Sequence, residues 1–227
     1  MSQFETGSAL RIKDEVAALK RERIVSAAVE LFYERGYEHT TLEAVAERLG
    51  VTKPFIYAHF KSKTELLAEI CGRGIGSSLR AIDGVLAMSG TPTEKLRMLG
   101  QKFVTSVLEN QKPIGIFTRE EKNLTPRDFK RISEMRRSFD AKLTGLLNAG
   151  IQRGEFRVAD PAIATLAIGG IVSWTYVWYR RNGRLSAAEL ADELAALILA
   201  VAGIVEPEAR LNGKAAGAKR GARRSRS

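Results

Sequence analysis

At 227 residues the chain is long enough to bury a core in one large or two small domains, and its net charge of +10 favours a polyanionic partner. The charge is uneven: residues 209–227 hold seven cations and no acid, so residues 1–208 hold 29 basic and 26 acidic side chains, a difference of +3. This excludes a general polycation, and affinity for DNA must come from a local surface. The single cysteine, Cys71, excludes an internal disulfide framework and is typical of a reducing cytoplasm.

One uncharged stretch raises the question of a membrane. Residues 161–179 carry no charged side chain and are followed by Arg180 and Arg181, a pattern that a membrane span also shows. The stretch contains polar residues such as Thr165 and Ser173, and no second stretch of similar length accompanies it. The amino-terminal residues lack the features of a secretory signal. We therefore expect a helix that is buried on all sides, with a membrane span as the alternative.

The amino-terminal part of the chain has a helical pattern. Residues 1–19 form a mixed-charge arm in this interpretation, and a first helix is expected over residues 20–35, where Gly36 stops it. Ser62 with Glu65 is a capping box, in which two side chains satisfy the free N–H groups at a helix start. It predicts a long helix that follows the motif described next.

Residues 40–60 contain two short amphipathic helices that meet at a glycine. Thr40 with Glu43 is a capping box for the first of them, and Gly50 ends it in a left-handed turn. Thr52 can cap the second helix. Helix, glycine turn and helix is the layout of a helix-turn-helix. The polar, basic and aromatic side chains on or near its outer edge are Thr52, Lys53, Phe55, Tyr57 and His59.

Helix start signals repeat through the second half of the chain. A capping residue precedes proline at Thr91-Pro92, Thr125-Pro126 and Asp160-Pro161, and Ser186 with Glu189 is a further capping box. No segment shows the sustained alternation of a strand. The sequence thus predicts an all-helical fold of about nine helices. The low-complexity stretch at residues 207–227 predicts a disordered basic tail.

The run A-A-V-E-L-F-Y-E-R-G-Y-E-H-T-T-L-E-A-V-A-E-R-L-G-V-T-K-P-F-I-Y-A-H-F-K-S-K-T-E-L-L resembles the TetR family of bacterial transcriptional regulators, over roughly residues 20–70. The resemblance implies a helix-turn-helix DNA-binding domain at residues 20–66 and a ligand-binding and dimerisation domain at residues 67–206. It implies that Thr41 approaches a phosphate. It further implies base-edge contacts from Thr52, Lys53 and Phe55, and phosphate contacts from Tyr57, His59 and Lys63. The chemistry agrees, because hydroxyl, imidazole N–H and ammonium groups are all hydrogen-bond donors.

Two of these assignments have alternatives. Members of the family commonly have a small residue or glycine where Pro54 and Phe55 stand, so Phe55 either packs on a thymine methyl group or turns into the core. Tyr57 and His59 are either phosphate contacts or partly buried turn residues. The operator sequence is not inferable from these residues.

The resemblance also implies a second subunit and a ligand. In the family, the last two helices pair with those of another subunit, and Gly169-Gly170 would let helices approach closely. The stretch W-T-Y-V-W-Y-R-R-N-G-R-L-S-A-A-E-L-A-D-E-L resembles regulators of fatty-acid, steroid-ring or aromatic catabolism that bind acyl-CoA thioesters. This closer likeness implies a pocket lined by Phe103, Phe117, Phe139, Trp174 and Trp178, with Arg119 or Arg180 near an anionic headgroup. By their spacing alone, the two tryptophans share one helix face, and such an aromatic pair is usually part of a core rather than a ligand wall.

The sequence therefore predicts a cytoplasmic, homodimeric DNA-binding regulator, in the first place a repressor that a hydrophobic small molecule releases from its operator. An architectural DNA-binding protein, with affinity from the basic tail and no effector, is the alternative. An enzyme would need a nucleophile, base or metal constellation, and none is found. Two histidines and one cysteine without metal spacing predict no zinc site, and no cofactor is expected.

Overall fold

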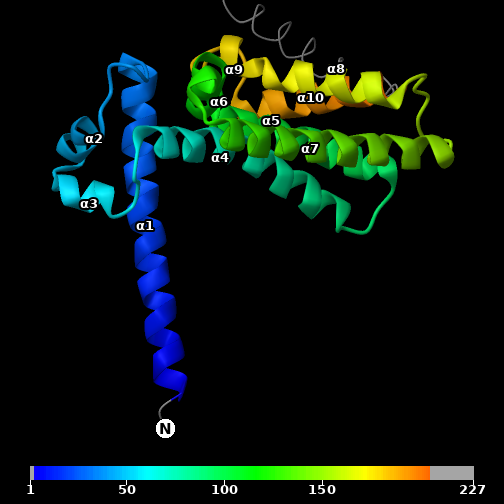
Figure 1. The fold of residues 1–227 in the computed structure, drawn as a ribbon. Helices are drawn as coiled ribbons and strands as arrows, with labels where there is room; N and C mark the ends of the chain where they lie inside the picture. Colours follow the sequence, from blue (N-terminus) through cyan, green and yellow to red (C-terminus); the bar gives the residue numbers. More distant parts are fainter. Residues whose placement is uncertain (1–2, 205–227) are drawn as a thin grey trace, which may run out of the picture.

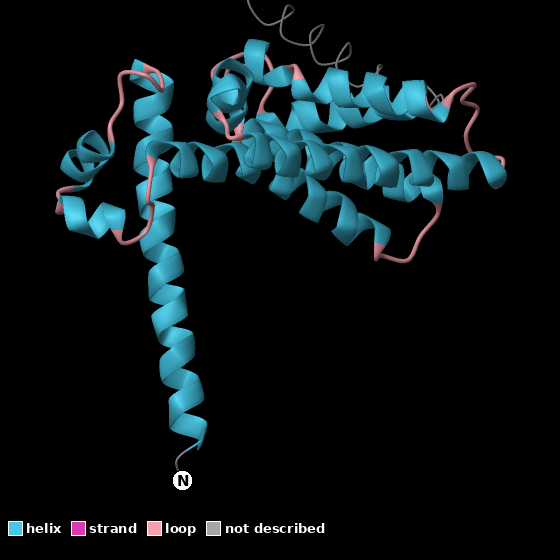
Figure 2. Ribbon diagram, in the orientation of Figure 1, coloured by secondary structure: helices cyan, strands magenta, loops and turns pink. Residues whose placement is uncertain are grey.

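The structure, a computed structural model, describes residues 3–204, with side chains from residue 14 onward. Over that part of the chain the regular structure consists of ten α-helices and one 3-10 helix, joined by short loops and without a strand (Figure 2). The predicted all-helical fold is confirmed, and the number of helices is close to the expected nine. The predicted basic tail at residues 207–227 lies outside the described residues.

Three helices and the start of a fourth form the amino-terminal domain at one end of the molecule (Figure 1). They are α1 (Gln3–Arg35), α2 (Leu42–Leu49), α3 (Lys53–Tyr57) and α4 (Lys63–Leu86). Their apolar sides meet in one core, whose fully buried members include Ile24, Phe32, Ile56, Phe60 and Leu66. Helix α4 leaves this core and runs into the carboxy-terminal bundle, so it joins the two domains (Figure 1).

The helix start expected near residue 20 is wrong, because α1 begins at Gln3 and includes most of the mixed-charge arm. Residues 3–19 contain no proline and a single glycine, so nothing in the sequence stops the helix from extending upstream. In Figure 1 this part of α1 projects away from the rest of the molecule. Residues 14–20 are all exposed, which explains why no apolar stripe marked the extension in the sequence.

The start of α2 lies one residue later than the sequence predicted. Thr41, not Thr40, is the N-cap, and its hydroxyl oxygen accepts a hydrogen bond from the Ala44 N–H at 3.1 Å. Thr40 is fully buried and donates to the Gly36 carbonyl at 2.9 Å, so its hydroxyl closes the loop after α1 instead. Gly50 ends α2 with a φ of 65°, the left-handed conformation that the sequence predicted for it.

The third helix is shorter than expected, and the fourth is capped differently. α3 ends at Tyr57 rather than at Phe60, and Thr52 stands at its N-cap position without a side-chain cap hydrogen bond. The Ser62 hydroxyl accepts from the Glu65 N–H at 3.1 Å, as predicted. The Glu65 carboxylate accepts from the N–H of Lys61 rather than of Ser62, so only half of the predicted box forms.

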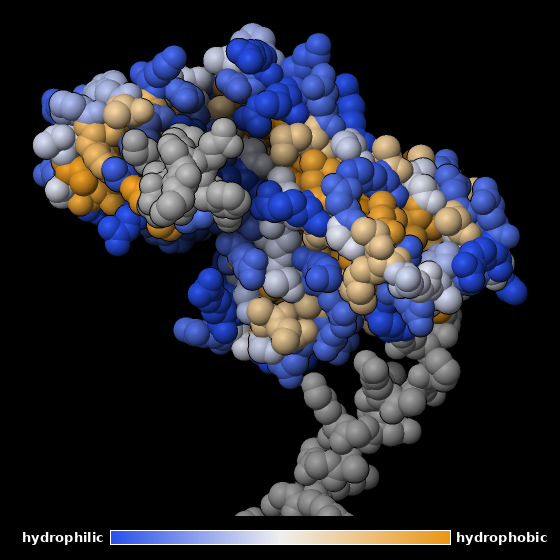
Figure 3. Space-filling model, turned by 90° about the horizontal axis from the view of Figure 1, so that it is seen from below, coloured by the Kyte–Doolittle hydropathy of each residue, from blue (hydrophilic) through white to orange (hydrophobic). Residues whose placement is uncertain are grey.

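The carboxy-terminal domain is a bundle built on the predicted start signals. Its helices are α5 (Pro92–Glu109), α6 (Gln111–Glu120), η1 (Glu121–Asn123), α7 (Pro126–Gln152), α8 (Pro161–Ser173), α9 (Thr175–Trp178) and α10 (Ala187–Val201). The expected caps are confirmed at Thr91, Thr125, Asp160 and Ser186. On the face shown in Figure 3, hydrophilic side chains surround smaller apolar areas.

The uncharged stretch is not buried on all sides, so that expectation is wrong. One side of α8 packs on the bundle core through Ala164, Ile168 and Val172. On the other side, Ile163 and Leu166 are each 62% exposed. By length and composition alone, Pro161–Trp178 is the one stretch among the described residues that could cross a membrane. The core of the bundle therefore covers only one side of this apolar helix.

The packing inside α7 gives a test of the fold. Gly150 is buried against Phe156, and a Cβ atom at Gly150 would overlap the Phe156 ring. We expect Gly150→Ala to lower the free energy of unfolding by about 1–3 kcal/mol, because the ring must shift within a packed core. Urea denaturation measures this change. Gly145 lies in the same helix with no atom within 4 Å of its Cβ position, so Gly145→Ala should be neutral or stabilise by up to about 1 kcal/mol.

Candidate nucleic-acid interface and ligand cavity

The polar edge of the helix-turn-helix is held outward by a buried anchor. Ile56 of α3 and Phe60, which follows the end of this helix, are fully buried and anchor α3 on the amino-terminal core. Thr52, Lys53 and Tyr57 are exposed on the opposite side. This arrangement makes their hydroxyl and ammonium donors available to a duplex without disturbing the core.

A carboxylate from α2 engages two of these donors. The Tyr57 hydroxyl donates to Glu43 Oε1 at 3.1 Å, and Lys53 Nζ lies 4.0 Å from the same oxygen. The Glu43 pKa is lowered by its own backbone N–H and by the Tyr57 hydroxyl, whereas the hydrogen bond to Glu43 raises the Tyr57 pKa. Sequence reasoning gave Glu43 only a capping role. A carboxylate thus lies where phosphates would be expected to bind.

Phe55 and His59 lie closer to the core than the exposed edge does. Phe55 is half-buried and packs against the amino-terminal core, so it has taken the second of its two predicted orientations. Its ring meets the His59 imidazole edge-on at 5.3 Å, and Lys20 Nζ lies 5.8 Å from its centroid. The His59 carbonyl accepts a hydrogen bond from Arg21 at 2.6 Å. These contacts fix the end of α3 to α1.

Thr41 and Lys63 stand at two helix starts beside this edge. Thr41 is exposed and its hydroxyl oxygen already caps α2. Lys63 Nζ donates to the Tyr37 carbonyl at 2.9 Å and lies 4.2 Å from the centroid of the Tyr37 ring. In this structure Lys63 therefore binds the loop after α1, and a phosphate would have to share or replace these contacts.

Glu43 provides a test of the exposed edge formed by Thr52, Lys53 and Tyr57, which is called the reading face below. Glu43→Gln removes a negative charge from beside Lys53 and Tyr57. We expect binding to any duplex to tighten by about 3–10-fold near 0.1 M salt, with the salt slope steeper by about 0.9, because Lys53 becomes free to pair with a phosphate. Fluorescence-anisotropy titrations across a salt series measure both quantities. Glu34 pairs with Arg48 at 3.3 Å, so Glu34→Gln makes the same charge change elsewhere; equal effects of both variants would contradict the assignment.

The two domains share their packing. The amino-terminal core includes Ile116 of α6, Leu124 of the following loop and Ile132 of α7, each buried. Ile75 of α4 packs against both this core and the core of the bundle. A movement of α6 or α7 in the bundle therefore changes the support on which α1 and α4 rest.

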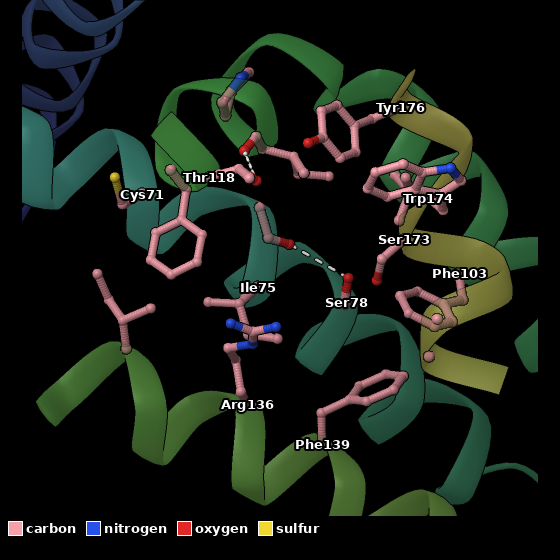
Figure 4. Close-up of a pocket in the computed structure, with 18 of the residues that line it drawn as sticks. Cys71, Ile75, Ser78, Phe103, Thr118, Arg136, Phe139, Ser173, Trp174 and Tyr176 are labelled. Carbon is pink, nitrogen blue, oxygen red and sulfur yellow. Dashed lines mark hydrogen bonds between the residues drawn. The ribbon is translucent and has the colours of Figure 1, made fainter. Parts of the chain in front are cut away.

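A cavity of about 530 Å³ lies directly beyond this shared packing. Its volume is within the range of about 300–1,000 Å³ that suits a small organic ligand. Five helices, α4 to α8, contribute most of its wall, and α9 closes one side through Tyr176 (Figure 4). The apolar part of the wall includes Ile75, Phe103, Val107, Ile114, Phe117, Ile132, Phe139, Leu166 and Trp174.

The structure brings together four of the five residues predicted to line the pocket. Phe103, Phe117, Phe139 and Trp174 line the cavity, with the Phe103 and Phe139 rings 4.7 Å apart. Trp178 is outside the lining and exposed, and Trp174 is 60% exposed, so neither tryptophan is a core residue. The sequence left both interpretations of the tryptophans open, because an aromatic side chain that lines a cavity and one that lies in the core follow the same helical spacing.

The predicted cations are elsewhere. Arg119 lies outside the cavity lining, with its guanidinium 5.2 Å from the Tyr33 ring centroid, because its helix face turns toward α1. Arg180 donates to the carbonyls of Val177 and Tyr179, which fold it back on its own turn.

The charged residues that line the cavity are Glu121, Arg136 and Asp140. Sequence reasoning missed them. The signal was present in α7, where Arg136 falls on the same helical stripe as Ile132, Phe139 and Leu143. The Arg136 guanidinium lies 5.5 Å from the Phe117 ring centroid. Burial raises the Asp140 pKa, and Arg136 opposes that shift.

The cavity also holds the chain's cysteine. Burial, followed by Glu120 and Glu121, raises the pKa of the Cys71 thiol to about 12. The thiol is therefore neutral at physiological pH, and it contributes to the wall as a small apolar group.

Comparison with known proteins decides the family. The model described as "Bacterial regulatory proteins, tetR family" matches residues 24–70, and that described as "Tetracyclin repressor-like, C-terminal domain" matches residues 89–202. The chain belongs to the TetR family. It is accordingly a helix-turn-helix DNA-binding transcriptional regulator of a family that consists of regulators rather than enzymes.

Individual TetR-family relatives match over most of their length. The fatty acid metabolism regulator protein of Bacillus subtilis (strain 168) is 26% identical over 183 residues, 79% of this chain and 94% of that protein. The transcriptional repressor KstR2 of Mycolicibacterium smegmatis is 24% identical over 184 residues, 80% of this chain and 90% of that protein.

Solved structures of the family resemble this fold closely. PfmR of Thermus thermophilus is 31% identical with a TM-score of 0.72, and the match covers 78% of this chain and 97% of that chain. AibR, solved in complex with isovaleryl coenzyme A and operator DNA, is 26% identical with a TM-score of 0.68, over 78% of this chain and 97% of that chain.

Proposed function

We propose that this TetR-family protein is a cytoplasmic, homodimeric repressor that leaves its operator when an apolar small molecule fills the cavity between α4 and α8. The observation that carries the proposal is the position of the cavity, which directly adjoins the packing shared by the two domains. The DNA contacts proposed are those of Thr41, Thr52, Lys53, Tyr57 and Lys63, with Phe55 and His59 supporting the end of α3 rather than projecting freely.

The exposed side of α8 and α10 supports dimerisation through these helices. Ile163, Leu166 and Trp174 are each at least 60% exposed, and Leu197 of α10 is 51% exposed. Soluble monomers rarely leave such a group of large apolar side chains in water. Gly169 and Gly170 lie near the end of α8, and neither has an atom within 4 Å of its Cβ position. A second subunit would cover this side and provide the close helix approach that the glycine pair predicts.

Contacts between α6 and α1 support the proposed coupling of ligand to DNA. Pro113 and Phe117 of α6 line the cavity, while Lys112 of the same helix forms an ion pair with Glu30 of α1. Lys112 also contacts Tyr33 of α1, because its Nζ atom lies 5.7 Å from the centroid of the Tyr33 ring. A ligand that favours another position of α6 therefore also favours another position of α1. Its effect on operator affinity is limited by the difference between its affinities for the two conformations.

The finer proposal for the effector is an acyl-CoA thioester. It is supported by the names of two relatives, the fatty acid metabolism regulator of Bacillus subtilis and AibR bound to isovaleryl coenzyme A. The apolar wall formed by Phe103 and Phe139 suits an acyl chain.

An operator-release experiment tests the proposal. The purified protein is titrated against a duplex from its own upstream region in a mobility-shift assay, and acyl-CoA thioesters and their free acids are then added. We expect a specific shift and its loss with at least one thioester. A mobility shift that no apolar compound reverses would refute the proposed release by an effector. Absence of any preferred duplex would refute the proposed sequence-specific regulation.

The dimer is tested on α8. Ile163→Glu places a charge in the proposed interface, so the mass in solution should fall from twice 25.0 kDa to 25.0 kDa. Operator affinity should drop by at least about 100-fold, because a monomer binds a single half-site. Light scattering after size exclusion measures the mass. Leu19 of α1 is 66% exposed and far from α8 along the chain, so Leu19→Glu should remain dimeric; a monomer from both variants would contradict the assigned face.

A further inference from the structure

Two of the three charged side chains that line the cavity stand on one helix, whereas its other polar side chains, Ser78, Thr118, Glu121, Ser173 and Tyr176, come from other elements. Arg136 and Asp140 are one turn apart on α7, and both line the cavity. In Figure 4, Arg136 extends from α7 toward the middle of the cavity, between Ile75 and Phe139. The remaining wall around them is mostly aliphatic and aromatic. A ligand with an apolar body would therefore place its polar end at these two side chains.

These two residues are not paired with each other. Opposite charges four residues apart on a helix often form an ion pair, yet none within 4.0 Å joins Arg136 to Asp140. The Arg136 guanidinium is held over the Phe117 ring instead, which leaves its N–H groups free to donate. Asp140 is partly buried and accepts no hydrogen bond from the residues that the structure describes. Its carboxylate oxygens are therefore open to a donor from outside the chain, and a ligand hydroxyl that enters the cavity would supply one.

The charge of the lining limits the ligand. Two carboxylates, Glu121 and Asp140, accompany a single cation, Arg136. A headgroup with several phosphate charges would gain no net attraction inside such a cavity. Any such headgroup must lie outside, and the part of the ligand that enters must be uncharged or carry one compact acceptor group.

We propose that the cavity selects an apolar chain that carries a carbonyl or carboxylate oxygen with a hydroxyl close by, the oxygen accepting from Arg136 and the hydroxyl donating to Asp140. The proposal rests on the proposed function, since it takes the cavity to be the effector site. A 3-hydroxyacyl chain has this chemistry. It occurs both in a free hydroxy acid and in its coenzyme A thioester, whose nucleotide would stay outside the cavity.

Binding of matched pairs of ligands tests the proposal. Isothermal titration calorimetry on the full-length protein gives dissociation constants for decanoic acid and 3-hydroxydecanoic acid, and for the coenzyme A thioesters of both. We expect the hydroxylated member of a pair to bind about tenfold more tightly, because a hydrogen bond to a charged acceptor stabilises the complex by that order. Preference in the free acids, in the thioesters or in both supports the proposal and identifies the source. No binding, or equal binding within each pair, overturns it.

Three variants assign the preference to its residue. Asp140→Ala should abolish the tenfold preference without weakening the unsubstituted ligand. Arg136→Met should weaken both members of a pair by about tenfold and leave their ratio unchanged. Glu121→Ala is the matched control, because it removes the other cavity carboxylate, and the preference should survive it. A preference that survives Asp140→Ala, or is lost in Glu121→Ala, overturns the proposal. Thermal unfolding checks that each variant is folded.

The mobility-shift assay separates this inference from the proposed function. Hydroxylated and unsubstituted ligands that bind equally and release the operator equally leave the regulator intact and overturn the inference. A preference that depends on Asp140, with no release of the operator by any ligand, leaves the inference intact and overturns the proposed function.

Discussion

The amino-terminal core is completed by side chains from the other domain. Ile116, Leu124 and Ile132 come from α6, the following loop and α7, yet they are buried together with Phe32 and Leu66 of the helix-turn-helix domain. A domain as small as the helix-turn-helix domain buries little apolar surface by itself, so these three side chains from the other domain contribute to its stability. The packing of the helix-turn-helix domain therefore depends on α6 and α7, which also form part of the cavity wall, and the proposed coupling of ligand to DNA would act through this shared core.

Individual charged side chains matter more in this protein than its net charge does. Only +3 of the net charge belongs to residues 1–208, and the reading face combines Lys53 with Glu43 at 4.0 Å. At the DNA contacts proposed above, the Glu43 carboxylate would weaken the attraction to every phosphate alike, so binding would depend more on contacts to the bases of one sequence. The cavity follows the same principle, because Arg136 is oriented by an aromatic ring and remains available to a ligand.

The features that depend on neighbouring residues could be predicted from the sequence, whereas those that depend on distant packing could not. Gly50 and the caps at Thr91 and Ser186 are local, and they formed as expected. The cap of α2 moved from Thr40 to Thr41, because tertiary packing buried Thr40. Arg119 and Arg136 are both cations on helices near aromatic residues, and only the fold decides which of them faces the cavity.

Both sides of helix α8 are apolar in sequence, and the second side has two contacts to explain it, the cavity and the proposed partner subunit. Leu166, Gly170 and Trp174 line the cavity and are also exposed on the side where a second subunit is proposed to bind. One helix would then serve both as cavity wall and as dimer interface. A ligand that displaces α8 would reorient the subunits, and two reading helices must lie about 34–36 Å apart to enter successive major grooves. In the proposed dimer, a rotation of the subunits about α8 would change the separation of the two helix-turn-helix domains, and that change would couple the cavity wall to operator affinity.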